Sequence, residues 1–170
     1  MSNAEVTPGS YLYWSEVECS DGTPYPEDLR SRLFSIVVPA WKAIRAEVGR
    51  VVGRETPITV TSFYRTAKYN RAIGGAANSR HVRGDAWDST AFPGLPVLAY
   101  GVLVARMARQ HPELLIQGVG LYLEDGMVHT DCRPIAQSTP VLWRAVYVPD
   151  PKHPGKMKRV YLNWSGTGVE

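Results

Sequence analysis

Patterns typical of helices and patterns typical of strands occupy different parts of this chain, and this segregation limits the folds open to it. Helical patterns cover about residues 27–49 and 96–110, and most strand patterns follow in the C-terminal third. A parallel sheet needs strands and helices that alternate, because each parallel strand is reached through a crossover. The order along this chain therefore predicts the α+β class, with an antiparallel sheet flanked by helices.

The two predicted helices are defined by apolar residues that recur every three to four positions. The first covers about residues 27–49 and is expected to end near Gly49 or Gly53. Pro39 lies inside this pattern and should kink the helix or split it in two. The second covers about residues 96–110, with a proline in its first turn.

Strands are predicted where apolar or β-branched residues alternate with polar ones. These segments are residues 58–62, 118–123, 127–131, 142–148 and 159–164. Residues 124–126, Glu-Asp-Gly, separate the second and third of them and are typical of a hairpin turn. Residues 65–80 have a helical or turn-like character.

Length and composition exclude several classes of protein. The 170 residues are 44% hydrophobic and 21% charged, which is typical of a globular domain and predicts a single domain over residues 5–170, with residues 1–4 read as a cloning remnant. The net charge of +3 is too small to indicate a nucleic-acid-binding protein. No apolar run reaches the length of a membrane span, and we expect no membrane insertion.

Cys19 and Cys132 leave open one long-range disulfide.

Two pairs of residues carry the types of side chain that bind metals. His81 and Asp88 are seven positions apart, about 23 Å in an extended chain, so only a chain reversal, which Gly84 favours, brings them together. His129 and Asp131 share one face of a strand. Two imidazoles and one carboxylate match a catalytic zinc site with a position open for water. The spacing alone equally allows a simple turn and a half-buried histidine.

Several segments, taken in order, resemble one known family. They are Ser62-Phe63-Tyr64-Arg65, Asn70, Gly74-Gly75-Ala76, Ser79, His81, Gly84, Ala86, Asp88, Gly118-Val119-Gly120-Leu121-Tyr122 and His129-Thr130-Asp131. Together they resemble the M15 zinc peptidases, over about residues 15–135. These are D-alanyl-D-alanine carboxypeptidases and phage cell-wall endopeptidases that share a fold with the Hedgehog signalling domain. The resemblance therefore implies a Hedgehog/DD-peptidase-like fold.

The resemblance also implies roles for individual residues. His81, Asp88 and His129 would bind one zinc ion per chain, and Arg65 would hold the substrate carbonyl or stabilise the negative charge that develops on it. This chemistry is coherent, because zinc lowers the pKa of a water molecule towards 7 and a guanidinium supplies fixed positive charge.

Three further residues are expected on the substrate side of the site. Ser79, two residues before His81, would fix the loop with its hydroxyl group and face the substrate. Tyr122 is expected to contact the substrate, and Trp87, which lies between site residues, is expected to border it.

The general base is the one role for which this sequence departs from many members of the family. They carry Asp or Glu three residues before the last histidine ligand, and this chain has Gly126 there. Asp131 lies about 6.6 Å along the strand from His129 and would act either as the base or as a group that orients the histidine. Glu124 and Asp125 are the alternative bases.

The function that the resemblance implies is zinc-dependent hydrolysis of an amide bond in the peptide stems or cross-links of bacterial peptidoglycan. The partner is a peptidoglycan peptide, and we expect a monomer that is made in the cytoplasm and acts on the cell wall as a phage lysis or virion-associated protein. Because an acid is missing at Gly126, an inactive, zinc-stabilised module that binds the wall or serves a structural role is the alternative.

Overall fold

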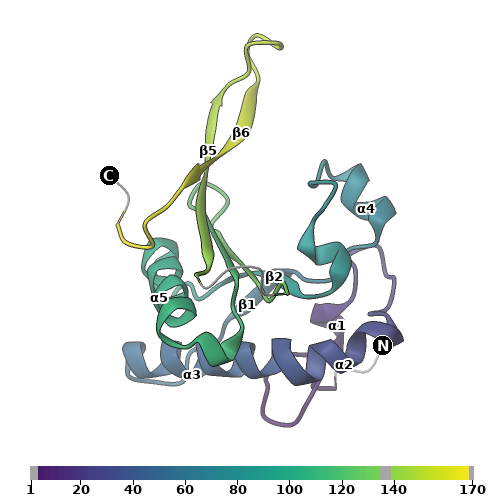
Figure 1. Cartoon of the computed structure of the whole chain (residues 1–170), viewed down its shortest axis with the longest axis vertical. Coiled ribbons are helices and arrows are strands. Elements are labelled where there is room, and N and C mark those ends of the chain that lie inside the picture. The colour runs from purple at the N-terminus through teal and green to yellow at the C-terminus, as the bar shows by residue number, and fades with distance from the viewer. Residues whose placement is uncertain (1–3, 135–138, 169–170) are drawn as a thin grey trace.

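A six-stranded sheet positions the other elements of this protein. The computed structural model describes residues 4–134 and 139–168, so that residues 1–3 of the suggested cloning remnant lie outside the described part. The strand order is β1-β2-β4-β3-β5-β6 (Figure 1). The strands are β1 (Thr59–Ser62), β2 (Ala86–Thr90), β3 (Gly118–Tyr122), β4 (Met127–Asp131), β5 (Val141–Pro149) and β6 (Met157–Asn163).

The helices lie mostly before and between the first strands. They are α1 (Trp14–Val17), η1 (Glu27–Leu29), α2 (Arg30–Arg32), η2 (Leu33–Val37), α3 (Val38–Val52), α4 (Ala67–Ala72), η3 (Arg80–Arg83), α5 (Val97–Gln110) and η4 (Pro112–Leu114). The α+β class predicted from the sequence is confirmed. Among the described residues, no helix combines the length and the apolar character needed to cross a membrane.

One pair of strands departs from the predicted antiparallel sheet. The neighbours β1 and β2, β2 and β4, β3 and β4, and β5 and β6 are antiparallel, whereas β3 and β5 are parallel. Because β2 already pairs with one edge of β4 and β3 with the other, the chain after β4 crosses to the free edge of β3 and runs parallel to it. The sheet is therefore mixed at this pair.

The first predicted helix is present as consecutive helical segments from Glu27 to Val52. Its regular α-helical pattern is interrupted next to Pro39, as the sequence predicted. A π-helical segment, η2, lies directly before α3, and Pro39 occupies the first turn of α3. Proline has no backbone N–H to donate into the preceding turn, which explains why the regular α-helical pattern is lost there. The helix ends at Gly53, one of the two predicted positions.

The strand that the sequence failed to predict is β2. Four of its five residues are buried, so both of its faces are covered and its sequence lacks the alternation that marks a half-exposed strand. It pairs with β1 on one side and with β4 on the other. This central position brings Asp88 into the middle of the sheet.

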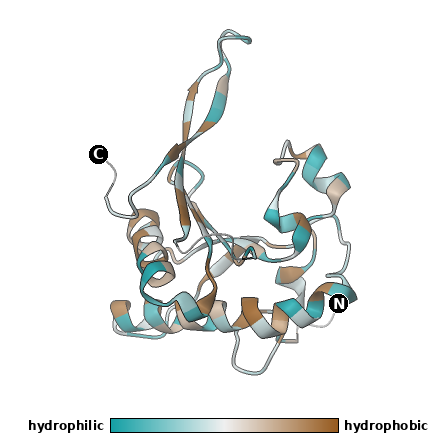
Figure 2. Ribbon diagram, in the orientation of Figure 1, coloured by the Kyte–Doolittle hydropathy of each residue, from teal (hydrophilic) through white to brown (hydrophobic). Residues whose placement is uncertain are grey.

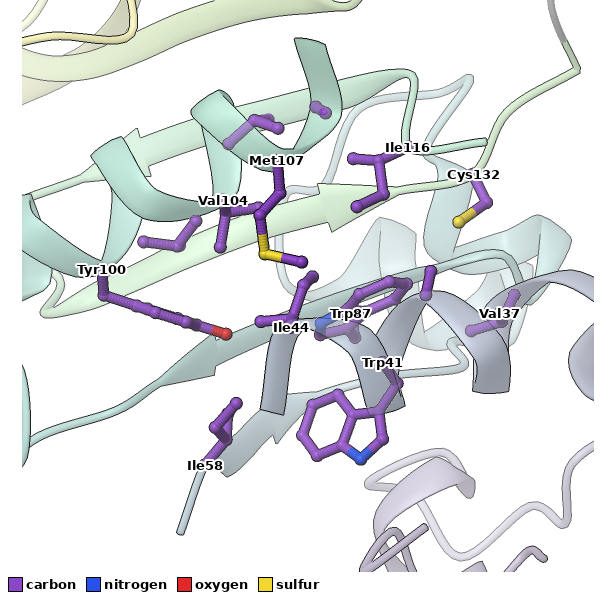
Figure 3. Close-up of a cluster of buried hydrophobic side chains, with 14 of the residues drawn as sticks. Val37, Trp41, Ile44, Ile58, Trp87, Tyr100, Val104, Met107, Ile116 and Cys132 are labelled. Atoms are coloured by element: carbon purple, nitrogen blue, oxygen red, sulfur yellow. The ribbon is translucent and has the colours of Figure 1, made fainter. Parts of the chain in front are cut away.

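The hydrophobic core lies on one face of the sheet, beneath α3 and α5 (Figure 3). Trp87 of β2 is fully buried there, edge-on to Trp41 of α3 with ring centroids 6.2 Å apart, and Met107 of α5 belongs to the same cluster. Both helices carry hydrophobic and hydrophilic residues, as helices with one covered face do (Figure 2). Since strand residues alternate in direction, the neighbours of the core residues point to the opposite face.

The two cysteines do not form the bridge that the sequence left open. Cys19 and Cys132 are both free, and both are buried. Cys132 packs with the core residues, and the Sγ atom of Cys19 accepts a hydrogen bond from the backbone N–H of Thr66 at 3.5 Å. They act as packing residues in this structure.

Replacing Trp41 by alanine is expected to lower the free energy of unfolding by about 3–5 kcal/mol, because a large buried ring is lost. The change also removes the 2.9 Å hydrogen bond from Trp41 Nε1 to the backbone oxygen of Ser10, which fastens the segment before α1 to α3. Urea denaturation followed by circular dichroism measures the effect. Val51→Ala, at an exposed position of the same helix, is the control, and equal losses in the two variants would contradict the prediction.

Candidate metal centre

The three predicted metal ligands lie together in the structure. His81 Nε2 lies 3.1 Å from His129 Nδ1 and 3.2 Å from Asp88 Oδ1, and His129 Nδ1 lies 2.9 Å from the same carboxylate oxygen. All three side chains are buried. One donor atom from each residue therefore points at a common position.

The sequence between the first two ligands folds back on itself to make this contact. His81 lies in the short helix η3, which ends at Gly84 with a positive φ of 68°. A side chain at Gly84 would also collide with Tyr25, whose hydroxyl donates a 2.7 Å hydrogen bond to the Gly84 carbonyl. The chain then enters β2, where Asp88 stands opposite His129 of β4.

A buried ion-pair cluster holds this turn in place. The carboxylate of Asp85, which is almost completely buried, accepts hydrogen bonds from Arg32 Nε at 3.2 Å and from Arg80 Nε at 3.0 Å. Arg80 comes from η3 and Arg32 from α2, so the cluster joins the turn to the helical layer. The two guanidinium partners offset the free-energy cost of burying the Asp85 carboxylate.

The donor atoms fit a zinc ion in chemistry and spacing. Zinc binds imidazole nitrogen and carboxylate oxygen at about 2.0–2.2 Å, so tetrahedral ligands lie about 3.3 Å from one another. The observed separations of 2.9–3.2 Å are close to this value. The second nitrogen of each histidine also has an acceptor: His81 Nδ1 lies 2.6 Å from the Phe63 carbonyl oxygen and His129 Nε2 lies 3.2 Å from Asp131 Oδ2. Such contacts fix the ring orientation of metal-binding histidines.

The electrostatics of the group follow from burial and from these contacts. Burial raises the pKa of Asp88, but His81 and His129 outweigh it and hold the pKa well below its usual range. Burial lowers the pKa of His129, and the hydrogen bonds to Asp131 and Asp88 overcome this and raise it to about 9. Burial dominates at His81, whose pKa is lowered. The Asp88 carboxylate therefore stays ionised and available as a ligand.

Asp131 lies behind His129 rather than beside the donor atoms. It is fully buried, and its oxygens accept hydrogen bonds from Arg133 Nε at 2.7 Å and Nη2 at 2.6 Å. The oxygen that faces His129 contacts Nε2, on the side of the ring away from the donor atom Nδ1. The arrangement orients His129 and keeps the Asp131 carboxylate away from the open side of the centre.

The two alternative bases lie at the turn between β3 and β4. Asp125 accepts hydrogen bonds from Tyr147 Oη at 2.9 Å and from Arg159 Nη2 at 3.0 Å. Glu124 is exposed, and neither residue is among the described residues that line the cleft. In the structure, Asp125 connects this turn to the β5–β6 hairpin.

Arg65 is hydrogen-bonded to Asp88, one of the three candidate ligands. Its Nη2 donates to Asp88 Oδ2 at 2.6 Å, and its Nε donates to Ser62 Oγ at 2.8 Å. The contact leaves the other oxygen of Asp88 facing the two histidines. The guanidinium lines the same cleft as the three candidate ligands, which places a fixed positive charge next to them.

The centre opens into a cleft of about 560 Å³. One wall is the segment from Ile73 to His81, which follows α4 and includes Ser79, and the other is formed by Tyr122 and the β5–β6 hairpin. In Figure 1 these two walls rise on opposite sides of the central strands. Ser79 and Tyr122 both line this cleft.

Trp87 requires a correction. It was expected to border the substrate, but it has no exposed surface and its ring stacks on Phe63 within the core (Figure 3). Neighbouring residues of a strand point to opposite faces, so the position next to Asp88 places Trp87 on the face away from the cleft. The assignment of Trp87 to the substrate side does not fit this position.

Several residues of the cleft were missed by the sequence analysis, among them Arg80, Arg133, Trp143, Arg159 and Tyr161. One signal could have revealed Trp143: a side chain at Gly120 would lie 2.5 Å from its indole ring, so the glycines of β3 make room for a large residue from another strand. Arg159 and Tyr161 follow only from the pairing of β5 and β6 with the sheet, and Arg133 follows from its position directly after β4.

Comparison with protein families matches residues 35–131 to Peptidase M15. The chain belongs to the M15 peptidase family. The M15 match includes all three candidate ligands and Arg65, and it confirms the Hedgehog/DD-peptidase fold that the resemblance implied. It ends at Asp131, before the β5–β6 hairpin. Comparison with curated proteins found no match.

Asp131→Asn is expected to weaken zinc binding about 10- to 100-fold while the fold is retained, because the acceptor that orients His129 loses its charge. Competition with a chromophoric chelator measures the affinity. Asp125→Asn, which removes a carboxylate at the nearby turn, is the matched control and should bind zinc as the unchanged protein does. Equal affinities in all three proteins would contradict the orienting role.

Proposed function

We propose that this M15 family member is a zinc-dependent peptidase that hydrolyses an amide bond in the peptide stems or cross-links of bacterial peptidoglycan. The observation that carries the proposal is the convergence of His81 Nε2, His129 Nδ1 and Asp88 Oδ1 at the cleft. The cell wall as substrate comes from the resemblance to carboxypeptidases and phage endopeptidases. On the same basis we propose a phage lysis or virion-associated role.

His81, Asp88 and His129 would hold one zinc ion in this proposal. When bound, zinc supplies a Lewis acid that polarises the scissile carbonyl group and lowers the pKa of a water molecule to about 7. The chain keeps its donor atoms in place through the contacts of His81 with Phe63 and of His129 with Asp131. Among the residues that the structure describes, these contacts leave Nε2 of His81 and Nδ1 of His129 with no protein partners other than one another and Asp88.

Arg65 would stabilise the negative charge that develops on the carbonyl oxygen. It is 15% exposed, lines the cleft and is held by Asp88 and Ser62, so its guanidinium is oriented before a substrate arrives. A preorganised cation in a partly enclosed site stabilises a developing oxyanion more than a mobile one does. Ser79 and Tyr122 would contact the substrate from the two walls.

A second candidate function is a zinc-stabilised module that binds the cell wall without cleaving it. Asp88 is the single acidic residue among the described residues that line the cleft, and Asp88 is itself a candidate ligand. Asp131 is enclosed by Arg133 and His129, which supports an orienting role over that of a base. This shortage of a carboxylate on the open side is what favours the binding module.

Digestion of purified peptidoglycan tests the two functions. Zinc-loaded protein should release soluble fragments whose masses correspond to amide hydrolysis, and His129→Ala should release none because the metal is lost. Glu124→Ala, at an exposed position outside the cleft lining, should behave as the unchanged protein. Zinc-loaded protein that sediments with several chemically different walls but releases no fragment would refute the peptidase and support the binding module.

Arg65→Ala is expected to lower kcat about 10²- to 10³-fold, the effect of removing one group that stabilises an oxyanion. Initial rates are compared at equal zinc content, measured for each preparation, because Arg65 also contacts Asp88. Arg71→Ala removes an exposed arginine of α4 that is not among the described lining residues and is the matched control. An unchanged kcat in the zinc-loaded Arg65→Ala protein would remove Arg65 from the mechanism.

A further inference from the structure

The β5–β6 hairpin continues the face of the sheet that carries the metal ligands. Asp88, His129, Gly120 and Trp143 pair in turn across β2, β4, β3 and β5, so they form one row. Positions two and four residues along a strand point to the same face. On β6, Asn163 pairs with Trp143 and continues the row. Tyr161 and Arg159 lie two and four residues before Asn163, so they share its face, and they pair with Ala145 and Tyr147 of β5.

An aromatic strip leads outward from the metal centre on this face. We define it as Trp143, Tyr122 and Tyr161. The ring of Trp143 lies 5.4 Å from that of His129, and its Nε1 donates to Tyr122 Oη at 3.3 Å. Tyr122 lies edge-on to Tyr161, with ring centroids 6.3 Å apart. The strip thus connects a candidate ligand to the hairpin without a break.

Arg159 provides a cation at the outer end of the aromatic strip. Its guanidinium carbon lies 5.4 Å from the ring centre of Tyr122, and its side chain is 36% exposed. Its acidic partner, Asp125, lies outside the described lining of the cleft, whereas Arg159 lines it. The Nε and Nη2 atoms of Arg159 donate to Tyr147 Oη, and Nη2 also donates to Asp125, so Nη1 is the group that would meet a carboxylate of the ligand with a charge-assisted hydrogen bond.

The remaining charges of the cleft favour an anionic ligand. Four arginines line it, namely Arg65, Arg80, Arg133 and Arg159, against the single carboxylate of Asp88 among the described lining residues. Asp85 and Asp131, the partners of Arg80 and Arg133, are buried behind them. The side of these pairs that faces the cleft is therefore the cationic one.

We propose that Arg159 binds a carboxylate group of the peptide substrate, while the aromatic strip holds the short segment between this carboxylate and the bond that is cut. The guanidinium lies over Tyr122, which is two residues from Gly120 on β3, or about 7 Å of strand. Two residues of an extended peptide cover the same length. The recognised carboxylate therefore lies on the hairpin side of the bond that is cut.

This inference rests on the proposed peptide substrate but not on turnover. It assigns a specificity-determining role to a residue beyond the family match, which ends at residue 131. The hairpin would then decide which peptides bind, and the centre shared with the M15 family would act on whatever is bound.

Calorimetric titration of zinc-loaded protein tests the inference. The probes are a synthetic peptidoglycan stem pentapeptide with free carboxylates and the same peptide with these groups as carboxamides. Titrations use the Arg65→Ala background, in which turnover is expected to be about 10²- to 10³-fold slower, so that little peptide is consumed during a titration. The carboxylate form should bind about tenfold more tightly, as expected for a charge-assisted hydrogen bond. Adding Arg159→Ala should abolish this preference, and Arg159→Lys should retain part of it.

Two control variants separate recognition from a structural role. Lys158→Ala removes the same charge from the neighbouring residue, which points to the other face of β6 and does not line the cleft, and the preference should stay. Asp125→Asn removes the negative charge that pairs with Arg159, whereas the hydrogen bonds from Arg159 to Tyr147 Oη still hold the guanidinium, and the preference should also stay. Loss of the preference in Asp125→Asn to the same degree as in Arg159→Ala would overturn the inference.

The outcomes also distinguish this inference from the proposed function. Equal binding of the two peptides in protein with Arg159 overturns the inference, even if peptidoglycan is cleaved. A carboxylate preference that depends on Arg159, in a protein that cleaves no wall, supports the inference and refutes hydrolysis.

Discussion

The register of four central strands is the constraint on which the rest of this structure depends. It aligns Asp88, His129, Gly120 and Trp143 in one row across β2, β4, β3 and β5. A shift of one residue in this register would turn every side chain to the other face of the sheet, so it would disrupt the core and the metal centre at the same time. Trp87 and Val119 fill the core only in the register that also points Asp88 and Gly120 towards the cleft. The burial of large apolar side chains beneath α3 and α5 thereby fixes the positions of polar groups on the opposite face.

The polar side of the sheet is stable because its buried acids have cationic partners. Asp88 is bonded to Arg65, Asp131 to Arg133, and Asp85 to Arg32 and Arg80. A buried carboxylate without a partner would be strongly destabilising, whereas a paired one mainly adds specificity of position. Arg65, Arg80 and Arg133 line the cleft, whereas Asp85 and Asp131 are buried behind their partners. The same contacts that make burial tolerable therefore give the cleft its cationic character and hold the donor atoms ready for a metal ion.

The family assignment and the proposed specificity belong to different parts of the chain. The M15 match covers the ligands, Arg65 and the strands that carry them, whereas one wall of the cleft is built largely from the hairpin that follows. Chemistry and recognition are commonly divided in this way between a scaffold and the segments added to it. The absence of an acid at Gly126 and the enclosed position of Asp131 set this chain apart from the arrangement expected of many relatives, and they make the test of turnover decisive.

The sequence by itself determined the two long helices, most strands and the three residues that converge as candidate ligands, since these follow from local periodicity, from the glycine that permits a chain reversal and from the family resemblance. It did not show that Trp87 belongs to the core, that β3 and β5 run parallel, or that Arg159 and Tyr161 reach the cleft. Alternation within a strand tells which residues share a face, but not which face is covered or which distant strand lies alongside. Only the tertiary structure decides these, because they depend on pairing between segments far apart in the chain and on where the helices pack.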